Sequence, residues 1–167
     1  MKEMNSEYIL EAIDREFPEA ILDASETHGM LTIEIKKDEI KKVTHFLKVS
    51  SLNFHFLTDV CGIHYPDNKE KELGVIYHLH NMVENVRIRL KTFMPREGAE
   101  VESLVDLYAG ANWMERETYD FFGIKFTGHP DLRVILNMPD LGYHPLLKEY
   151  RLEDGTRTDK NDLMFGR

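Results

Sequence analysis

The densest group of chemically active side chains lies between Asn112 and Gly123. This segment reads NWMERETYDFFG, and its apolar residues recur at the spacing of a helix, about 100° per residue. On such a helix Trp113, Met114 and Phe121 define one arc, with Glu117 in its middle. A buried carboxylate without a partner costs several kcal/mol, so Glu117 is expected to be protonated or to meet a cation or backbone donors.

Two interpretations of this helix remain open. Glu117 belongs either to a charged network or proton site at an interface, or to an ordinary internal ion pair that holds the helix against the strands. Arg116 and Asp120 lie one turn apart on the adjoining flank, where they are expected to pair with each other at the surface. Glu115 is on the opposite side, so its loss is expected to matter far less than the loss of Glu117.

Histidines and the single cysteine supply further candidates. His78 and His80 are two residues apart in a predicted strand, so their rings share a face and could bind a metal with a third ligand from elsewhere; a solvated or partner-facing pair is more common. His129 and His144 each precede a proline and could be ligands or proton carriers, although rings that pack beside proline and bond to backbone are more common. Cys61 is expected to be a small buried hydrophobe.

Several kinds of site are excluded by motifs that the sequence lacks. It has no GxGxxG, GxxxxGK[ST], CxxC, HExxH or GxSxG pattern, and these are the usual signatures of nucleotide, zinc and acyl-transfer sites. One cysteine cannot supply the four thiolates that an iron–sulfur cluster normally takes. The sequence therefore assigns no catalytic, cofactor-binding or metal-binding residue.

Charge and hydropathy narrow the class of partner. The chain has 21 Lys and Arg against 30 Asp and Glu, a formal net charge of −9, which disfavours a nucleic-acid partner. Its apolar runs fall short of the roughly 18 residues of a membrane span, and its acidic, amphipathic start does not resemble a signal peptide. These features are typical of a cytoplasmic protein without a membrane span.

The elements that position these residues follow from apolar spacing. Helical intervals predict helices near 5–16, 38–50, 103–108 and 112–122, the first capped by Asn5 or Ser6 and the second by Asp38. Strict alternation predicts strands near 20–24, 31–35 and 54–60, and a hairpin over 73–94 with its turn at 81–85. One hairpin face is apolar, and the other carries His78, His80, Arg87, Arg89 and Lys91. We expect an α+β fold, in which a mixed or antiparallel sheet of about five strands packs with helices on one face.

The regular pattern ends at Gly123. Two His-Pro dipeptides, further prolines and several glycines follow, and an irregular region of that length is usually functional or lies on a partner. We therefore divide the chain into an α+β domain over 1–123 and an irregular extended arm over 124–167 that docks on a partner. Residues 147–167 are expected to be mobile in the isolated chain, with apolar anchors at Leu152 and Leu163–Phe165.

The helix and the turn after it resemble a known family. An Asn-Trp, then Glu-Arg-Glu, an acidic residue before aromatics, Gly-Ile and a Gly-His-Pro-x-Leu-Arg turn are the most distinctive motif of the C-type, or thirty-kilodalton-type, subunit of bacterial proton-pumping NADH:quinone oxidoreductase, respiratory complex I. Upstream, the sequences at 56–59, 65–66 and 75–79 are similar to the family's strand motifs. The residues that the resemblance marks as an interface or structural motif are Trp113, Glu115, Arg116, Glu117, Asp120, His129, Pro130, Arg133, His144, Pro145 and Lys148.

The resemblance implies a scaffold role. The C-type subunit of this family carries no cofactor; flavin and iron–sulfur clusters lie in partner subunits. It belongs to the hydrophilic arm on the cytoplasmic side of the inner membrane and packs against the D-type subunit, whose cavity receives the quinone headgroup. The complex passes electrons from NADH to quinone with coupled proton translocation, and the isolated chain is expected to have no activity.

Two other functions stay open. The family commonly has arginine at the positions of Val134 and Leu147, and related subunits occur in membrane-bound hydrogenases and formate hydrogenlyase, so the chain could belong to such a complex. In the other alternative it is a stand-alone α+β protein that binds a metal or small molecule through its histidines. The partners that purify with the native chain would distinguish these functions.

Overall fold

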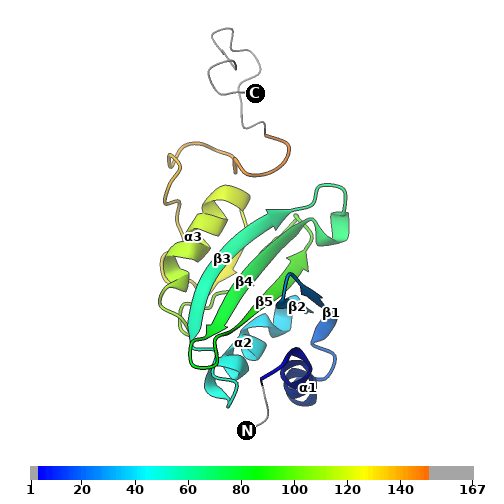
Figure 1. The fold of residues 1–167 in the computed structure, drawn as a ribbon. Helices are drawn as coiled ribbons and strands as arrows, with labels where there is room; N and C mark the ends of the chain where they lie inside the picture. Colours follow the sequence, from blue (N-terminus) through cyan, green and yellow to red (C-terminus); the bar gives the residue numbers. More distant parts are fainter. Residues whose placement is uncertain (1–3, 151–167) are drawn as a thin grey trace, which may run out of the picture.

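A five-stranded mixed sheet forms the centre of the protein, and the computed structural model describes residues 4–150 (Figure 1). The strand order is β1-β2-β5-β4-β3. Neighbouring strands are antiparallel except for β2 and β5, which are parallel. The strands are β1 (Ile21–Thr27), β2 (Met30–Ile35), β3 (Phe56–His64), β4 (Leu73–Asn81) and β5 (Val86–Met94).

Helices and short elements complete the fold. The helices are α1 (Ser6–Glu16), α2 (Ile40–Val49) and α3 (Ala111–Phe122), with single 3₁₀ turns η1 (Lys37–Glu39) and η2 (Lys69–Lys71). Two short strands, β6 (Glu100–Glu102) and β7 (Lys125–Thr127), pair in parallel. The expected fold class, α+β with a mixed sheet of five strands and helices on one face, is confirmed.

The hydrophobic core lies between the sheet and the helices. Ile9 and Ile13 of α1 and Leu47 of α2 are buried against the apolar face of the sheet, which includes Tyr77 and Leu90. The hairpin of β4 and β5 has the expected turn, and it pairs Tyr77 with Leu90 on the core face and His78 with Arg89 on the opposite face. Alternation along the two strands thus separates an apolar face from a polar one, as predicted.

Of three helix features predicted from the sequence, one is confirmed and two are wrong. The side chain of Asn5 accepts a hydrogen bond from Tyr8 N at 2.9 Å and caps α1, as expected. Asp38 does not cap α2, because it lies inside the 3₁₀ turn that leads into the helix. Residues 103–108 form a turn rather than the expected helix, since the side chain of Glu115 binds the backbone N–H of Leu104.

The irregular region begins later than Gly123. Residues 125–127 form β7, and Ile124 and Phe126 are buried in the core. Leu147, at the start of the segment expected to be mobile, is also buried, with 3% of its surface exposed. The division into a domain and a docking arm stays a prediction, and the anchors at Leu152 and Leu163–Phe165 lie outside the described residues.

A buried hydroxyl offers a test of this core. The Tyr77 hydroxyl has no hydrogen-bond partner within residues 4–150, whereas the Tyr108 hydroxyl donates to Phe54 O at 2.7 Å. Replacing Tyr77 with Phe should leave the free energy of unfolding unchanged or raise it by about 1 kcal/mol, because an unpaired buried polar group is removed. Tyr108→Phe should lower it by about 1–2 kcal/mol. Urea unfolding of both variants measures the difference, and equal losses of stability would contradict the described environment of Tyr77.

Candidate functional site

Helix α3 buries three charged side chains. Glu115, Arg116 and Asp120 have only 0%, 6% and 1% of their surfaces exposed. The helix ends at Gly123, whose φ of 78° is in the left-handed region that glycine adopts readily. Each buried charge binds an irregular segment before or after the helix, so α3 connects the sheet to the loops on either side of it.

Glu115 holds the turn that precedes the helix. Its carboxylate accepts hydrogen bonds from Ser103 Oγ at 2.6 Å and Leu104 N at 2.7 Å. Burial raises the pKa of Glu115 to about 7, although these two hydrogen bonds act in the opposite direction. The group therefore titrates near neutral pH while it organises residues 103–108.

The other two buried charges of α3 bind the backbone after β7. Arg116 donates from Nε to Arg133 O and from Nη2 to Val134 O, both at 3.2 Å. Asp120 Oδ2 accepts from the backbone N–H groups of residues 135, 136 and 137 at 3.1, 2.8 and 3.0 Å. Its Oδ1 accepts from Asn137 Nδ2 at 3.0 Å. Burial opposes ionisation of Asp120, but these hydrogen bonds outweigh it and lower the pKa of the carboxyl.

The expected orientation of α3 was wrong. Trp113, Glu117 and Phe121 do share an arc, but the arc faces outward: Trp113 is 62% exposed and Glu117 is exposed, whereas Glu115 is fully buried. Arg116 and Asp120 are buried and bind backbone groups rather than each other. The inward stripe is Ala111, Glu115, Thr118 and Phe122. It was missed because the aromatic side chains of the opposite arc were taken to mark the buried side of the helix.

Both histidines that precede prolines bind backbone groups. His129 Nε2 is 3.1 Å from Asn112 O, and its Nδ1 accepts from Asp131 N at 3.0 Å, so the Gly-His-Pro turn is tied to the start of α3. His144 Nδ1 is 2.9 Å from Asp120 O at the other end of the helix. Its ring lies against Gly123, where an added Cβ would be 2.6 Å from the ring. Gly123 is therefore required both by its φ angle and by this close approach.

Ion pairs attach the last described residues to the sheet. Lys148 N donates to His64 Nδ1 at 2.9 Å, and His64 Nε2 is 3.2 Å from Glu72 Oε1. Arg96 forms two hydrogen bonds with Glu149, of 2.7 and 2.8 Å, and this pairing lowers the pKa of Glu149 to about 2. The segment through residue 149 is thus held by a buried histidine and a bidentate ion pair.

The loop that α3 binds carries exposed apolar side chains. We call this set the arm surface; its members are Trp113 (62% exposed), Leu136 (65%), Met138 (65%), Tyr143 (43%), Leu146 (39%) and Tyr150 (38%). Arg116 lies 5.3 Å from the Trp113 ring centroid, so the indole stacks over a buried cation. Exposed aromatic and aliphatic side chains on an ordered backbone are typical of protein interfaces.

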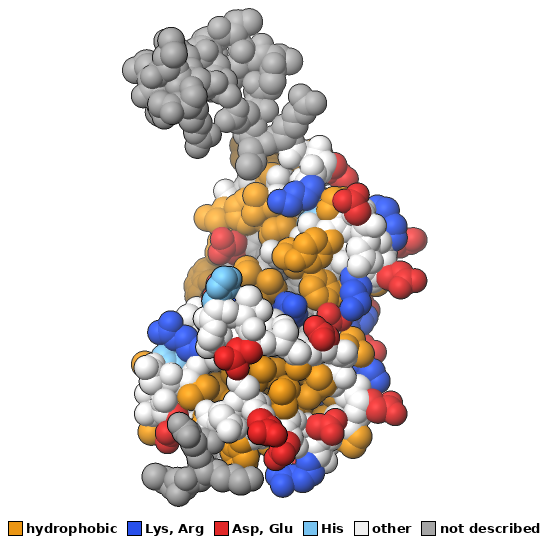
Figure 2. Space-filling model, turned by 45° about the vertical axis from the view of Figure 1, so that its right-hand side comes forward, with side chains coloured by type: hydrophobic (Ala, Val, Ile, Leu, Met, Phe, Trp, Pro, Cys, Tyr) orange, Lys and Arg blue, Asp and Glu red, His pale blue; other side chains and the backbone are white. Residues whose placement is uncertain are grey.

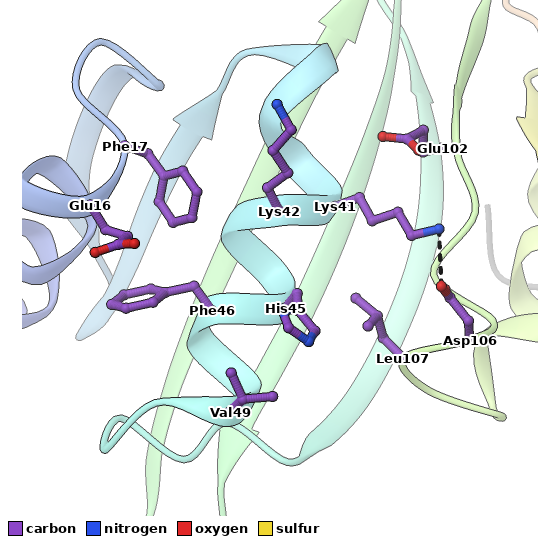
Figure 3. Close-up of a pocket in the computed structure, with 10 residues that line it drawn as sticks. All are labelled: Glu16, Phe17, Lys41, Lys42, His45, Phe46, Val49, Glu102, Asp106 and Leu107. Atoms are coloured by element: carbon purple, nitrogen blue, oxygen red, sulfur yellow. Dashed lines mark ion pairs between the residues drawn. The ribbon is translucent and has the colours of Figure 1, made fainter.

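A second feature is a surface hollow of about 590 Å³ over α2 (Figure 3). Phe17 and Phe46 line one side with their ring centroids 5.6 Å apart. On the other side of the helix, Lys41 Nζ pairs with Asp106 Oδ2 at 3.1 Å (Figure 3). Both lysines of the hollow are paired with carboxylates, Lys41 with Asp106 and Lys42 with Glu39. Apolar walls with paired lysines suit a protein or ligand contact better than acid–base chemistry.

The predicted site residues fall into two groups. The structure brings Arg116, Asp120, His129 and His144 to the loop after α3, with Pro130 and Pro145 in the turns beside the two histidines. Glu115 points to the turn before the helix. Glu117 and Lys148 are exposed, and exposed Arg133 pairs with Asp131 at 2.9 Å. His64, Arg96 and Glu149 were missed, because their partners are far apart in sequence.

The paired histidines of β4 have partners within the sheet. His78 Nε2 accepts from Arg89 Nε at 2.9 Å, and His80 Nε2 is 3.2 Å from Asn85 Oδ1. Cys61 is half-buried, and burial raises its pKa to about 11. In the described part of the chain, no group of three His, Cys, Asp or Glu side chains could hold a metal ion.

Comparison with known proteins decides the family. Residues 33–156 match the family model described as "Respiratory-chain NADH dehydrogenase, 30 Kd subunit". The chain belongs to this family. A relative named as the C-type subunit of NADH-quinone oxidoreductase, from Xanthobacter autotrophicus, is 45% identical over 78% of this chain, which spans 62% of that protein. The corresponding subunit of F(420)H(2) dehydrogenase from Methanosarcina mazei is 40% identical over 88% of this chain and 92% of its own length.

Two solved structures resemble the fold. A trypsin-resistant fragment of Nqo5 has a TM-score of 0.65 and 29% identity, over 75% of this chain and 98% of the fragment. A chain of the membrane-bound sulfane sulfur reductase, an archaeal respiratory membrane complex, has a TM-score of 0.73 and 26% identity, over 87% of this chain and 85% of its own length. None of the helices within residues 4–150 is long and apolar enough to cross a membrane.

Glu115 should make the stability of this family member depend on pH. Its pKa of about 7 in the folded chain exceeds the value of about 4.3 for a free glutamate, so the stability it contributes is fully present below about pH 4 and is lost as the pH rises towards 7. The loss amounts to at most about 4 kcal/mol, since each pKa unit of difference corresponds to about 1.4 kcal/mol. Glu115→Gln cannot ionise, so its melting temperature relative to the parent should be higher at pH 8 than at pH 5.

Glu117→Gln is the matched control, because Glu117 lies on the exposed flank of the same helix. Its melting temperature should follow that of the parent at both pH values. If the difference in melting temperature between Glu115→Gln and the parent is the same at pH 5 and pH 8, Glu115 is not a buried carboxylate that titrates in this range.

Loss of the Asp120 carboxylate should release the loop. Asp120→Ala leaves three backbone N–H groups without their acceptor, at about 1–3 kcal/mol for each donor that stays buried. Amide exchange of residues 135–137 should accelerate at least tenfold, and trypsin should cleave faster after exposed Arg133. Asp131→Ala removes an exposed carboxylate from the same loop and is the control; identical exchange in the two variants would show that Asp120 does not hold the loop.

Proposed function

We propose that this chain is a scaffold subunit of the hydrophilic arm of an NADH:quinone oxidoreductase of the complex I type, and that it carries no cofactor itself. In this function it packs against the D-type subunit beside the quinone site and supports electron transfer from NADH to quinone with coupled proton translocation. Flavin and iron–sulfur clusters belong to partner subunits. The complex places the chain peripherally on the cytoplasmic side of the inner membrane.

The observation that carries the proposal is the arm surface. Arg116 and Asp120 bind the backbone of residues 133–137 from inside, and this leaves Leu136 and Met138 65% exposed on the outside. An irregular loop held by buried charges presents a defined shape, and a preformed surface binds a partner with a smaller entropic cost. Family membership makes a neighbouring subunit of the same complex the expected partner.

A second complex type is favoured by two relatives. The Methanosarcina mazei protein is named as a subunit of F(420)H(2) dehydrogenase, and the sulfane sulfur reductase belongs to an archaeal membrane complex. Both support the view that the same scaffold also works in complexes other than NADH:quinone oxidoreductase; a hydrogenase-type complex is the alternative that we keep. A stand-alone metal-binding function has less support, since His78 and His80 pair with Arg89 and Asn85.

Purification of the tagged chain from membranes of its native host tests the proposal. We expect a set of partner subunits by mass spectrometry, with quinone reductase activity in the purified complex, and NADH as the donor if the complex is of the complex I type. The chain produced alone should show neither visible absorbance nor NADH oxidation. Bound flavin, or stoichiometric iron or zinc after metal-free purification, would overturn the scaffold function.

Charges introduced on the arm surface should weaken assembly. Leu136→Asp with Met138→Asp places carboxylates in an apolar contact, where burial of an unpaired charge costs several kcal/mol, so co-purification with partners should fall at least tenfold. Met82→Asp with Val83→Asp is the matched control, since these apolar residues of the β4–β5 turn are 65% and 78% exposed. Equal recovery of partners with both double variants would contradict the arm surface as the interface.

A further inference from the structure

The face of the sheet opposite the helices is uncovered within residues 4–150. The core lies on the other side of β3, β4 and β5, and no helix crosses in front of these strands (Figure 1). We call this side the open face. Its central side chains are Arg87, Arg89, Lys91 and Phe93 of β5 and Ile76, His78 and His80 of β4. Arg87 is exposed and His80 is buried, whereas the others are half-buried.

Three cations form a column along the open face. Arg87, Arg89 and Lys91 are two residues apart on β5, which places successive charges about 7 Å apart. Arg89 donates to the ring of His78, and Lys91 lies 5.9 Å from the Phe93 ring centroid. Among the described residues, none of the three pairs with a carboxylate, although the chain has nine more acidic than basic side chains.

Several cations elsewhere on the surface pair with carboxylates. Lys41 pairs with Asp106, Lys71 with Glu34, and Arg96 with Glu149. Exposed Arg15 and Lys125 also form no ion pair with a described residue, so the β5 column is distinguished by the alignment of three such cations on one strand. Three aligned cations of one sign repel one another at this spacing, and an anionic occupant would relieve the repulsion.

His78 holds the middle of the column in place. Burial lowers the pKa of His78 and Arg89 lowers it further, although Asp59 acts in the opposite direction. The Nε2 atom of the ring accepts the hydrogen bond from Arg89 Nε. His78 Nδ1 faces Asp59 Oδ2 at 3.5 Å on the other side. Only Nε of Arg89 is used by this contact, and the two Nη groups are left to form a bidentate pair with a carboxylate.

We infer that the open face is a second docking surface, separate from the arm surface, for a segment of a neighbouring subunit that carries carboxylates about 7 Å apart. The inference rests on the proposed function, because the occupant belongs to the same complex. Apolar side chains border the column: Ile63, Ile76 and Phe93 are partly exposed, and Phe56 is 50% exposed. Arginine and aromatic side chains are enriched at protein interfaces relative to the rest of the surface.

The arrangement favours a protein segment over a flat polyanion. Glu34 of β2 lies next to Lys91 of β5, and Asp23 of β1 lies opposite Glu34 in the register of the sheet. Asp59 is on β3, so carboxylates flank the cations on both sides. A membrane surface or nucleic acid would be pressed against these groups, whereas a narrow segment can follow β5 alone. The face shown in Figure 2 likewise exposes hydrophobic side chains beside both acidic and basic ones.

The test uses the complex purified from membranes through a tag on this chain. Arg87→Glu with Arg89→Glu should reduce the recovery of partner subunits at least tenfold after a wash in moderate salt. Arg15→Glu with Lys125→Glu makes the same change of charge at exposed positions on α1 and β7 and should keep the parent's recovery. Because Arg89 is half-buried and bound to His78, the single variant Arg87→Glu at an exposed position is tested beside the double variant. It should lower recovery in the same direction, and the isolated Arg87→Glu chain should melt within about 2 °C of the parent, since surface substitutions change stability little.

Zero-length carbodiimide coupling identifies the occupant. Lys91 in the intact complex should join to an Asp or Glu of a neighbouring subunit, and it should react with an amine reagent at least fivefold more slowly than in the isolated chain. Lys125 provides the internal comparison. Equal labelling of Lys91 in both samples, with full recovery of partners by the β5 variant, would overturn the inference and leave the proposed function standing.

Two other outcomes also overturn the inference. If the slow reaction of Lys91 with the amine reagent disappears when lipids are removed, and no cross-link to a protein forms, the occupant is an anionic lipid. Failure of the unmodified chain to purify with any partner would contradict the proposed function itself. The two failures are distinguishable, because the first occurs in an assembled complex and the second occurs before any variant is made.

Discussion

The Asp120 carboxylate is the contact on which the organisation of the C-terminal half depends. One oxygen accepts three consecutive backbone N–H groups, from residues 135 to 137. A loop without regular structure has no internal partners for its backbone, so those groups must bind water or a side chain. Because α3 supplies that side chain from a buried position, the loop has a defined path, and the aromatic and aliphatic side chains of the arm surface are held outside.

Buried charges of this kind contribute specificity more than stability. The desolvation of Glu115 and Asp120 is costly, and an apolar helix face could pack as tightly. Each charge fixes the position of one backbone segment. Glu115 binds the turn at 103–104, whereas Arg116 and Asp120 bind the loop at 133–137. A scaffold subunit requires this property, since its contribution to a complex is the shape of a surface.

The arm surface and the open face differ in the physics of binding. The first is apolar and preformed, so burial of its side chains would supply most of the affinity. The second is a column of cations in an acidic chain, which would favour a correctly charged partner and disfavour wrong ones. Relatives of the chain are named as subunits of NADH-quinone oxidoreductase and F(420)H(2) dehydrogenase, and a chain of the sulfane sulfur reductase has a similar fold. A scaffold that contacts its neighbours through two separate surfaces can keep one while the other changes with the complex.

The sequence by itself determined the local elements. Alternation over 73–94 predicted the hairpin and which side chains share a face, because the two-residue period of a strand leaves no other arrangement once one face is buried. Helical spacing located α1 and α2, and the Glu-Arg-Glu and His-Pro motifs marked the family.

Only the tertiary structure decided the orientation of α3, the parallel pairing of β2 with β5, and the contribution of β7 to the core. Each depends on partners far away in the chain. Hydropathy treats Glu115 and Asp120 as surface residues, since the backbone N–H groups that compensate their burial come from loops 11 to 17 positions away. A charge is buried where the fold brings donors to it, and that condition cannot be evaluated from the helix sequence alone.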